Sequence, residues 1–210
     1  MIGGRSRGSA PRKKARSRRR ESAAYRFAPD TRKKRKGQSM IRTERLMIRR
    51  IAAGDREAIR DMWKEVARTP YARYDTPKDT SDAAVRARIE RWAACADSRE
   101  HLFFAVCLKE TVIGYIALNK RDNGYEAGYC FHPAYHGKGY ARESLAAVIG
   151  YMKENNVSLL TAGTALENTP SVRLLESVGF RLTGTEKVSF YRDEQGNALF
   201  FDGGIFELRL

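Results

Sequence analysis

The sequence predicts an α/β (α+β) domain, in which a mixed but mostly antiparallel sheet of six to seven strands is flanked by about four helices. Three observations lead to this class. The hydrophobic content of 42% is typical of a globular protein. Apolar residues recur at helical spacing in several segments, and short apolar runs of strand length lie between those segments. Three of these runs follow one another closely, which excludes a purely parallel sheet because such neighbours pair as hairpins.

The first half of the domain supplies one strand, two helices and then three strands in succession. Ile59, Met62, Trp63 and Val66 follow the i, i+3, i+4, i+7 spacing of one helix face. A polar cluster that offers N-caps precedes the second helix. The apolar runs on either side of residues 109–111 predict a hairpin. In order, we expect a strand at 46–51, helices beginning near 54 and 82, and strands at 102–108, 112–118 and 125–131.

The second half alternates helices and strands and closes with a strand pair. Leu145, Val148, Ile149 and Met152 restore a helical period. A shorter helix ends at Gly179, and a polar turn near residue 195 separates the last two strands. We expect a helix around 145–152, a strand at 157–162, a helix at 172–178, and strands from 180 and from 199. The predicted order is β-α-α-β-β-β-α-β-α-β-β.

The strong positive charge of the chain is concentrated in its first 39 residues. Residues 1–39 contain 15 of the 40 lysines and arginines and two acids, so they carry +13 of the net charge of +15. A segment this charged and this poor in aliphatic residues is expected to be disordered, and residues 40–210 are expected to form the folded domain. The tail is interpreted as dispensable or as an extension before a natural start at Met40. The alternatives are an arm that binds RNA or anionic surfaces, and a targeting segment.

The cysteines and the apolar runs argue against several classes of protein. Cys95, Cys107 and Cys130 are odd in number and show no metal-ligand spacing, so we expect neither a disulfide framework nor a bound metal. No apolar run approaches the ~20 residues that a membrane-spanning helix needs. We therefore expect a cytoplasmic protein without a membrane partner, which contacts nucleic acid only through its basic tail.

Residues 129–142 are the most informative stretch of the sequence. A strand ends there, a glycine-rich turn follows, and an amphipathic helix begins. Small residues let backbone N–H groups converge on an anion, and the helix N-terminus adds its positive dipole end, so the segment suits a phosphate or pyrophosphate. A Walker A loop is excluded by His132 and Gly139 at its required positions. The dinucleotide fingerprint is excluded by Arg142 in place of its third glycine.

This loop resembles the acetyl-CoA signature of the GNAT superfamily of N-acetyltransferases. That signature reads Arg/Gln-x-x-Gly-x-Gly/Ala and follows a proline that ends a strand. The corresponding residues here are His136, Gly139 and Ala141, and Pro133 lies three residues before the signature. His136 departs from the usual Arg or Gln. This departure matters little where the backbone makes the main phosphate contacts, as the resemblance implies.

Two further segments extend the resemblance over nearly all of residues 41–210. Asn168 and Ser171 are followed by Leu-Glu-x-x-Gly-Phe at residues 175–180, which is similar to the branch that contains the ribosomal-protein N-terminal (alanine/serine) acetyltransferases. Residues 43–49, Thr-Glu-Arg-Leu-x-Ile-Arg, resemble the opening of that branch. Each motif alone is a weak signal, but three in order with fitting elements between them make a strong one.

The resemblance implies a GNAT fold that binds acetyl-CoA as cosubstrate. The strand at residues 126–131 would splay from its parallel neighbour, and pantetheine would pair with the exposed edge. Backbone N–H groups near Tyr129, Cys130 and Phe131 would hold the thioester carbonyl. Asn168 and Ser171 would face the pantetheine or the sulfur. The remaining cofactor-binding residues, around the pyrophosphate, would be His136, Gly137, Lys138, Gly139, Tyr140, Ala141 and Arg142.

The expected reaction is direct attack of a substrate amine on the thioester in a ternary complex. The attacking amine must be neutral, and at pH 7 roughly one α-amine in ten is neutral against roughly one lysine in a few thousand. Glu126 is a candidate general base, directly or through water, and its alternative is a charge that points to solvent. Ser171 is a candidate acid or cofactor contact. Many GNAT enzymes have a Tyr acid where Leu175 stands, so Tyr191 or water are the other candidates.

The acceptor amine is the least determined part of the prediction. Tyr71 and Tyr74 lie in the loop that varies most between GNAT members, and they are candidate walls of the acceptor site. A protein N-terminus, such as that of a ribosomal protein, is the leading acceptor. The alternatives are a polyamine, amino-acid or antibiotic acetyltransferase and a non-catalytic CoA-binding module. A nucleic-acid-binding protein that acts through the tail is the weakest alternative.

Overall fold

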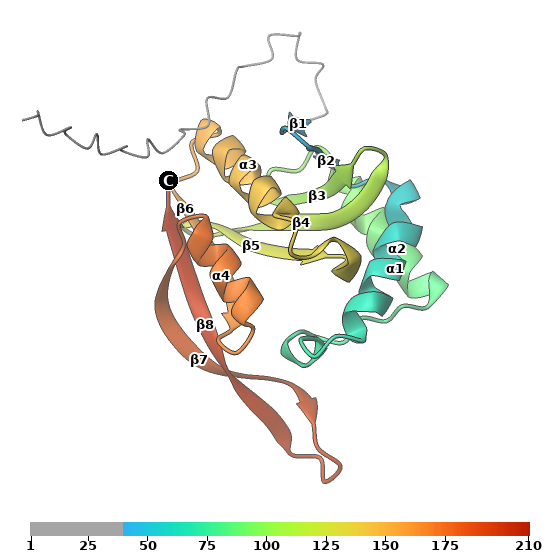
Figure 1. The fold of residues 1–210 in the computed structure, drawn as a ribbon, viewed down its shortest axis with the longest axis vertical. Coiled ribbons are helices and arrows are strands. Elements are labelled where there is room, and N and C mark those ends of the chain that lie inside the picture. Colours follow the sequence, from blue (N-terminus) through green and yellow to red (C-terminus); the bar gives the residue numbers. More distant parts are fainter. Residues whose placement is uncertain (1–39) are drawn as a thin grey trace, which may run out of the picture. The chain divides into compact units, whose positions relative to one another are not determined.

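One sheet of eight strands runs through the part of the chain that the structure describes. The structure is a computed structural model that describes residues 40–210, and the predictions made for residues 1–39 lie outside the described residues. The strand order is β1-β2-β3-β4-β5-β6-β8-β7 (Figure 1). The strands are β1 (Ile41–Arg42), β2 (Leu46–Arg50), β3 (His101–Leu108), β4 (Thr111–Arg121), β5 (Gly124–Phe131), β6 (Leu159–Ala165), β7 (Arg181–Arg192) and β8 (Ala198–Arg209).

Four helices flank this sheet within residues 40–210, which confirms the predicted fold class. They are α1 (Arg56–Ala67), α2 (Asp82–Ala94), α3 (Tyr140–Glu154) and α4 (Thr169–Ser177), and three short 3₁₀ turns lie at Ala53–Asp55, Ala72–Tyr74 and Pro133–Tyr135. The sheet has more strands than the six to seven expected, because β1 pairs with β2 through Ile41 opposite Ile48. A strand of two residues shows no period in the sequence, so the pattern could not reveal it.

The helices form two layers, and each layer covers its own hydrophobic cluster. Under α3 and α4 (Figure 1), one cluster joins Ile48, Phe104 and Ile116 to residues of both helices. Under α1 and α2, the second cluster is centred on Trp63, whose indole N–H donates to the Tyr115 hydroxyl at 3.2 Å. The two clusters fix both faces of β2, β3 and β4, so these strands form the rigid part of the sheet.

The sheet changes character between β5 and β6, which are its parallel pair in the described residues. Only two residue pairs join them, Tyr125 with Leu160 and Glu126 with Thr161. β6 continues to pair with β8 on its other side, from Leu159 to Ala165. From residue 127 onward, β5 therefore leaves β6, and the edge of β5 that faces β6 has no strand partner. The splay that the family resemblance implied is confirmed.

The last two strands form a long hairpin in which β8 lies between β6 and β7. Each strand is 12 residues long, and the distal part of the hairpin extends past α4 and the end of β6 (Figure 1). Large apolar side chains remain exposed on it, namely Leu182, Phe190, Leu199, Phe200 and Ile205. No helix within residues 40–210 is long and apolar enough to cross a membrane.

Candidate active site

The glycine-rich loop joins the splayed end of β5 to the start of α3. Gly137 and Gly139 have φ angles of +72° and +80°, a conformation that residues with a Cβ rarely adopt. Both are exposed, and a Cβ on Gly137 would meet only open space. Gly139 is also the N-cap residue of α3. The loop therefore presents backbone N–H groups and a helix N-terminus to solvent, which is the geometry that binds a phosphate.

Two side chains of the loop fold back onto the protein. The His136 Nε2 atom lies 2.8 Å from the carbonyl oxygen of Phe131, so Nε2 carries a proton and donates it to this acceptor. The Lys138 ammonium donates to the carbonyl of Ala134 at 2.9 Å and lies over the ring of Tyr135. Both side chains thus stabilise the loop itself. The roles predicted for them toward a phosphate stay predictions, whereas their backbone groups remain exposed with the rest of the loop.

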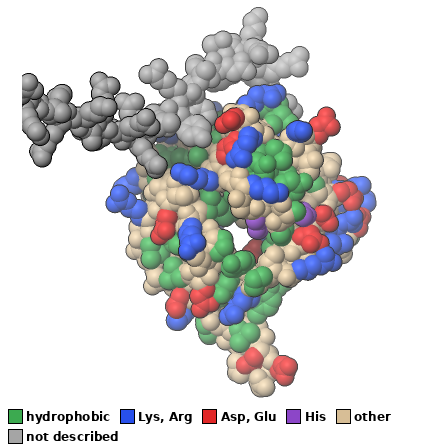
Figure 2. Space-filling model, viewed as in Figure 1, with side chains coloured by type: hydrophobic (Ala, Val, Ile, Leu, Met, Phe, Trp, Pro, Cys, Tyr) green, Lys and Arg blue, Asp and Glu red, His purple; other side chains and the backbone are tan. Residues whose placement is uncertain are grey.

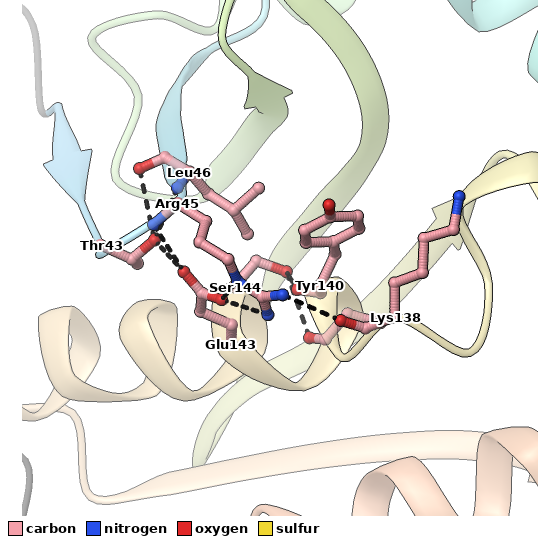
Figure 3. A network of polar contacts seen from close by, with 8 residues as sticks. Thr43, Arg45, Leu46, Lys138, Tyr140, Glu143 and Ser144 are labelled. Carbon is pink, nitrogen blue, oxygen red and sulfur yellow. Dashed lines mark hydrogen bonds and ion pairs between the residues drawn. The ribbon is translucent and has the colours of Figure 1, made fainter.

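A polar network ties the N-terminal segment of the described chain to this loop (Figure 3). The Arg45 guanidinium lies 2.6 Å from the carboxylate of Glu143 and donates to the carbonyl of Lys138 at 3.1 Å. It also covers the Tyr140 ring at 4.5 Å. The Thr43 hydroxyl donates to the same carboxylate at 2.5 Å. The segment that resembled the family's opening therefore holds the first turn of α3 and the loop before it.

The charge of Glu143 is maintained by these contacts. Partial burial works against the charged form, but the hydrogen bonds from Thr43 and Arg45 outweigh it, and the pKa of Glu143 is lowered. A negative charge in the first turn of α3 also complements the helix dipole. Residues 43–49 stood out in the sequence through the family resemblance. Their contact with Glu143 did not, because a pairing across 98 residues has no local signal.

The splayed edge of β5 faces the start of α4. The Tyr129 hydroxyl lies 2.8 Å from the Ser171 hydroxyl, and burial raises the pKa of Tyr129 to about 12. The side chain of Asn168 caps α4 by accepting from the backbone N–H of Ser171 at 3.4 Å. Leu175, one turn further along, is fully buried in the core. The structure thus brings together three of the predicted site residues, Tyr129, Asn168 and Ser171.

Cys130 and Phe131 complete the splayed segment of β5. Cys130 lies on the other face of the strand, against the cluster of Trp63, and burial raises the pKa of its thiol to about 12. The thiol is therefore neutral and poorly reactive at physiological pH. Phe131 is buried in the α3/α4 cluster. The side chains of both residues are part of the core, which leaves their backbone groups as the part that can contact a ligand.

Glu126 lies at the closed end of the splay. It is the last residue of β5 that pairs with β6, and its carboxylate forms an ion pair with Arg121 across the β4–β5 hairpin. Its side chain is 44% exposed. The loop glycines lie at the opposite, open end of the strand. The catalytic role predicted for Glu126 therefore stays a prediction, for a residue at the closed end of the wedge between the splayed strands β5 and β6, which we call the cleft.

A second group of contacts joins the 3₁₀ turn Ala72–Tyr74 to the C-terminal hairpin and to the turn before α4. The Tyr74 ring contacts Phe201 with centroids 5.4 Å apart, and the Tyr191 hydroxyl donates to the carbonyl of Ala72 at 3.2 Å. The Tyr74 hydroxyl also donates to Glu167, which directly precedes Asn168. Tyr71 is exposed nearby. Tyr74 therefore lies beside the turn that leads to Asn168, and its partner Glu167 has no local signal in the sequence because the two residues are 93 apart.

The space-filling view shows a hollow near the centre of this face (Figure 2). Histidine and hydrophobic side chains lie beside it. Within residues 40–210, no group of three His, Cys, Asp or Glu side chains is arranged to hold a metal ion. What the described residues do provide is an unpaired strand edge that leads into a glycine-rich loop whose geometry suits an anion. Such a combination suits an extended ligand with a phosphate group at one end.

Fold and site together define an acyl-CoA-dependent transferase. The family model for the acetyltransferase (GNAT) domain matches residues 45–181, which is more than half of the chain. The chain belongs to the GNAT acetyltransferase family and is an acetyl-CoA-dependent acyltransferase. The resemblance seen in the sequence is confirmed.

Known relatives agree with this assignment. The chain is 32% identical over 148 residues to an uncharacterized N-acetyltransferase, p20, of Bacillus licheniformis, which covers 68% of this chain and 82% of that protein. The fold of the present chain is similar to that of a ribosomal-protein-S5-alanine acetyltransferase from Vibrio fischeri, with a TM-score of 0.69 and 19% identity. The match covers 81% of this chain and 96% of the Vibrio fischeri chain. The fold is also similar to that of the Microcin C7 self-immunity acetyltransferase MccE, solved with acetyl-CoA and AMP, with a TM-score of 0.67, 15% identity, and coverage of 80% and 94%.

Proposed function

We propose that this enzyme transfers an acetyl group from acetyl-CoA to the α-amine of a protein N-terminus, by direct attack in a ternary complex. The observation that carries the acetyl-CoA part of the proposal is the splay of β5 from β6 after two residue pairs. This splay leaves a row of backbone groups that ends at the loop of Gly137 and Gly139. An extended pantetheine arm would pair with the row, and the pyrophosphate would bind at the loop.

The residues present fit acetyl-CoA. Gly137 leaves open space where a Cβ would stand, and the N-terminus of α3 lies directly behind it. The backbone of His136, Gly137, Lys138, Gly139, Tyr140, Ala141 and Arg142 would hold the pyrophosphate, with the Arg45–Glu143 ion pair fixing the loop from behind. When bound, acetyl-CoA supplies the thioester whose carbonyl carbon receives the amine.

The residues of β5 and α4 would act at the two ends of the breaking bond. Backbone N–H groups near Tyr129, Cys130 and Phe131 would stabilise the negative charge that develops on the thioester oxygen. The Ser171 hydroxyl would give a proton to the leaving sulfur. Tyr129, 2.8 Å from Ser171, would orient that hydroxyl and would stay protonated itself, since its pKa is about 12. This pair would replace the tyrosine acid that Leu175 cannot supply.

The preference for an α-amine rests on protonation and on the enzymes that share the fold. An α-amine is neutral in roughly one molecule in ten at pH 7, so it needs little help from a base, whereas a lysine needs far more. Glu126 or a water held near it would take the remaining proton. The fold is shared with enzymes that modify ribosomal proteins. A ribosomal protein is therefore our first choice of acceptor, and it would place the enzyme in the cytoplasm.

Thiol release from acetyl-CoA tests the proposal. We expect turnover with short peptides that have a free N-terminus and none with the same peptides after N-terminal acetylation, even when they contain lysine. Spermidine, free amino acids and aminoglycosides serve as competing acceptors. Faster turnover with one of these would contradict the protein-N-terminus assignment. Saturable binding of acetyl-CoA in calorimetry without turnover on any amine would indicate a non-catalytic module.

A further inference from the structure

Glu167 occupies a position that the reaction described so far does not use. It lies in the turn between β6 and α4, directly before Asn168, and its side chain is exposed. Its Oε2 atom accepts a hydrogen bond of 2.5 Å from the Tyr74 hydroxyl. This bond raises the pKa of Tyr74, because a hydroxyl that donates to a carboxylate holds its proton more tightly.

The Tyr74–Glu167 hydrogen bond joins two walls of the cleft from distant parts of the chain. Tyr74 comes from the 3₁₀ turn after α1, and Glu167 comes from the turn that leads to Ser171. Phe201 of the C-terminal hairpin packs against the Tyr74 ring and holds it in place. The carboxylate is therefore held against the 3₁₀ turn that follows α1, four residues along the chain from Ser171, the proton donor of the proposed function.

Two glycines leave the α1/α2 face of the splayed strands open. Gly128 of β5 and Gly163 of β6 alternate with residues that face the α3/α4 cluster, so they face the opposite side, and both are exposed. A Cβ added to either glycine would meet nothing within 4 Å. A small group can thus approach the splayed strands from this side. The glycine-rich loop leads into α3, which packs on the opposite face of the sheet, so an acceptor that approached from this side would not compete with the cofactor for space.

The carboxylate of Glu167 can accept further hydrogen bonds from a cation. An ionised carboxylate accepts about four hydrogen bonds, and Tyr74 uses one of them. Within residues 40–210, no hydrogen bond to the Oε1 atom is formed. The neighbouring charges have other contacts: Arg73 lies over the Tyr74 ring at 5.1 Å, and Asp202 pairs with Lys187 at 2.8 Å.

We propose that Glu167 binds the ammonium group of the acceptor and that Tyr74 is the positioning residue that holds this carboxylate. The proposal rests on the proposed function and deepens it by naming the residue that recognises the acceptor. The substrate class is a primary amine that arrives as a cation, and the contact is one charge-assisted hydrogen bond. The carboxylate concentrates the acceptor beside the thioester, and the amine attacks after it loses its proton to solvent or to a base.

The experiment compares E167Q, Y74F and the control E110Q, which changes an exposed carboxylate in the β3–β4 turn. For E167Q we expect the KM for a peptide α-amine to rise about tenfold, with the affinity for acetyl-CoA unchanged. Y74F keeps the charge and should raise KM by about threefold. E110Q should behave as wild type. Calorimetry of a free-amine peptide with the CoA-loaded protein should show the same order of affinities without any turnover.

A pH series separates ammonium binding from a general structural effect. The ratio of KM values between E167Q and wild type should fall as the pH rises from 7 to 9, because the acceptor loses its charge near pH 8. A ratio that does not change with pH, or a parallel loss of acetyl-CoA affinity, would overturn the proposal. The proposal would also be overturned if the KM of E126Q, and not that of E167Q, showed this dependence on pH. If wild type turns over no amine but the calorimetric order holds, the proposed function fails and the ammonium site stands.

Discussion

Two regions beside the cleft are held together by different kinds of contact. On the cofactor side, the loop around Gly139 is fixed by backbone conformation and by one ion pair, Arg45 with Glu143, that is itself hydrogen-bonded on several sides. On the acceptor side, a short 3₁₀ turn and a long hairpin meet through aromatic rings, and large apolar side chains such as Leu199 and Phe200 stay exposed. The first region depends on main-chain geometry, and the second on side chains.

This difference indicates how the two functions separate physically. A loop that binds a phosphate through its N–H groups depends on the φ angles of its glycines, so we expect substitutions there to weaken cofactor binding. A surface made of side chains can be altered one residue at a time without moving the backbone below it. Substitutions on the cofactor side should therefore stop the reaction, and those on the acceptor side should change which amine is used or how tightly it binds.

The largest effect is expected from Gly139→Val. At a φ of +80° a β-branched residue is strained by ~1–3 kcal/mol, and its side chain would press on the Arg45 guanidinium, 3.4 Å from an added Cβ. The loop would open, and we expect acetyl-CoA affinity to fall about 100-fold or more in calorimetry. Gly150→Ala is the control, because this helical glycine has open space around it and should gain ~0.5–1 kcal/mol of stability. Unchanged affinity in Gly139→Val would show that the loop does not bind the cofactor.

The next effect is expected at the hydroxyl pair of β5 and α4. Ser171→Ala removes the proposed proton donor and should lower kcat by about tenfold with little change in acetyl-CoA affinity. Tyr129→Phe should lower kcat less, because Ser171 keeps its hydroxyl but loses its orientation. Ser177→Ala, a serine at the end of the same helix whose hydroxyl bonds Leu174, is the matched control.

The pH profile sharpens this test. Since the pKa of Tyr129 is about 12, its hydroxyl stays protonated up to pH 10. Below pH 10, the alkaline limb of the kcat–pH profile should therefore lie at the same pH in Tyr129→Phe as in wild type. Loss of an alkaline limb in Tyr129→Phe would mean that Tyr129 titrates during the reaction and is itself the acid.

A smaller effect is expected on acid stability from Glu143→Gln. The pKa of Glu143 is lowered from its ordinary value of 4.5, so the folded state favours the charged form. The stabilisation is present above pH 4.5 and is lost as the pH falls through the lowered pKa of the folded protein. Thermal melts of wild type and Glu143→Gln should differ at pH 7 and converge at low pH. Glu154→Gln, at the end of α3, should track wild type throughout, and a gap that persists in acid would exclude the charge as its cause.

How much the sequence could predict follows the same division. The glycine-rich loop, Asn168 and Ser171 were found because a strand–turn–helix with small residues has a local pattern, and the same is true of the helices and most strands. The splay of β5 followed from the family resemblance. The elements on the cofactor side and the exposed backbone of the loop could therefore be predicted from the sequence.

Contacts between distant segments had no such pattern. Thr43 and Glu143 lie 100 residues apart, and Tyr74 and Glu167 lie 93 apart, so neither pair could be deduced from spacing. The partner of Tyr129 also came from the fold. Glu126 is a similar case. Its place in the strand was predicted, but its ion pair with Arg121 depends on the register of the β4–β5 hairpin, which the sequence pattern does not show.

The smallest effect is expected from Phe200→Ala in the hairpin, where Phe200 and its neighbour Phe201 face opposite sides of β8. Phe200 is 64% exposed, and Phe201 is 9% exposed against Tyr74. Phe200→Ala should change the free energy of unfolding by less than ~0.5 kcal/mol and leave the KM for the acceptor as it is, since little surface is buried there. Phe201→Ala should cost ~2 kcal/mol or more and raise the acceptor KM, because it removes the support of Tyr74. Chemical denaturation and steady-state kinetics on the pair measure both. If Phe200→Ala weakened acceptor binding as much as Phe201→Ala, the acceptor would be using both faces of the hairpin, and the acceptor surface would extend beyond the cleft.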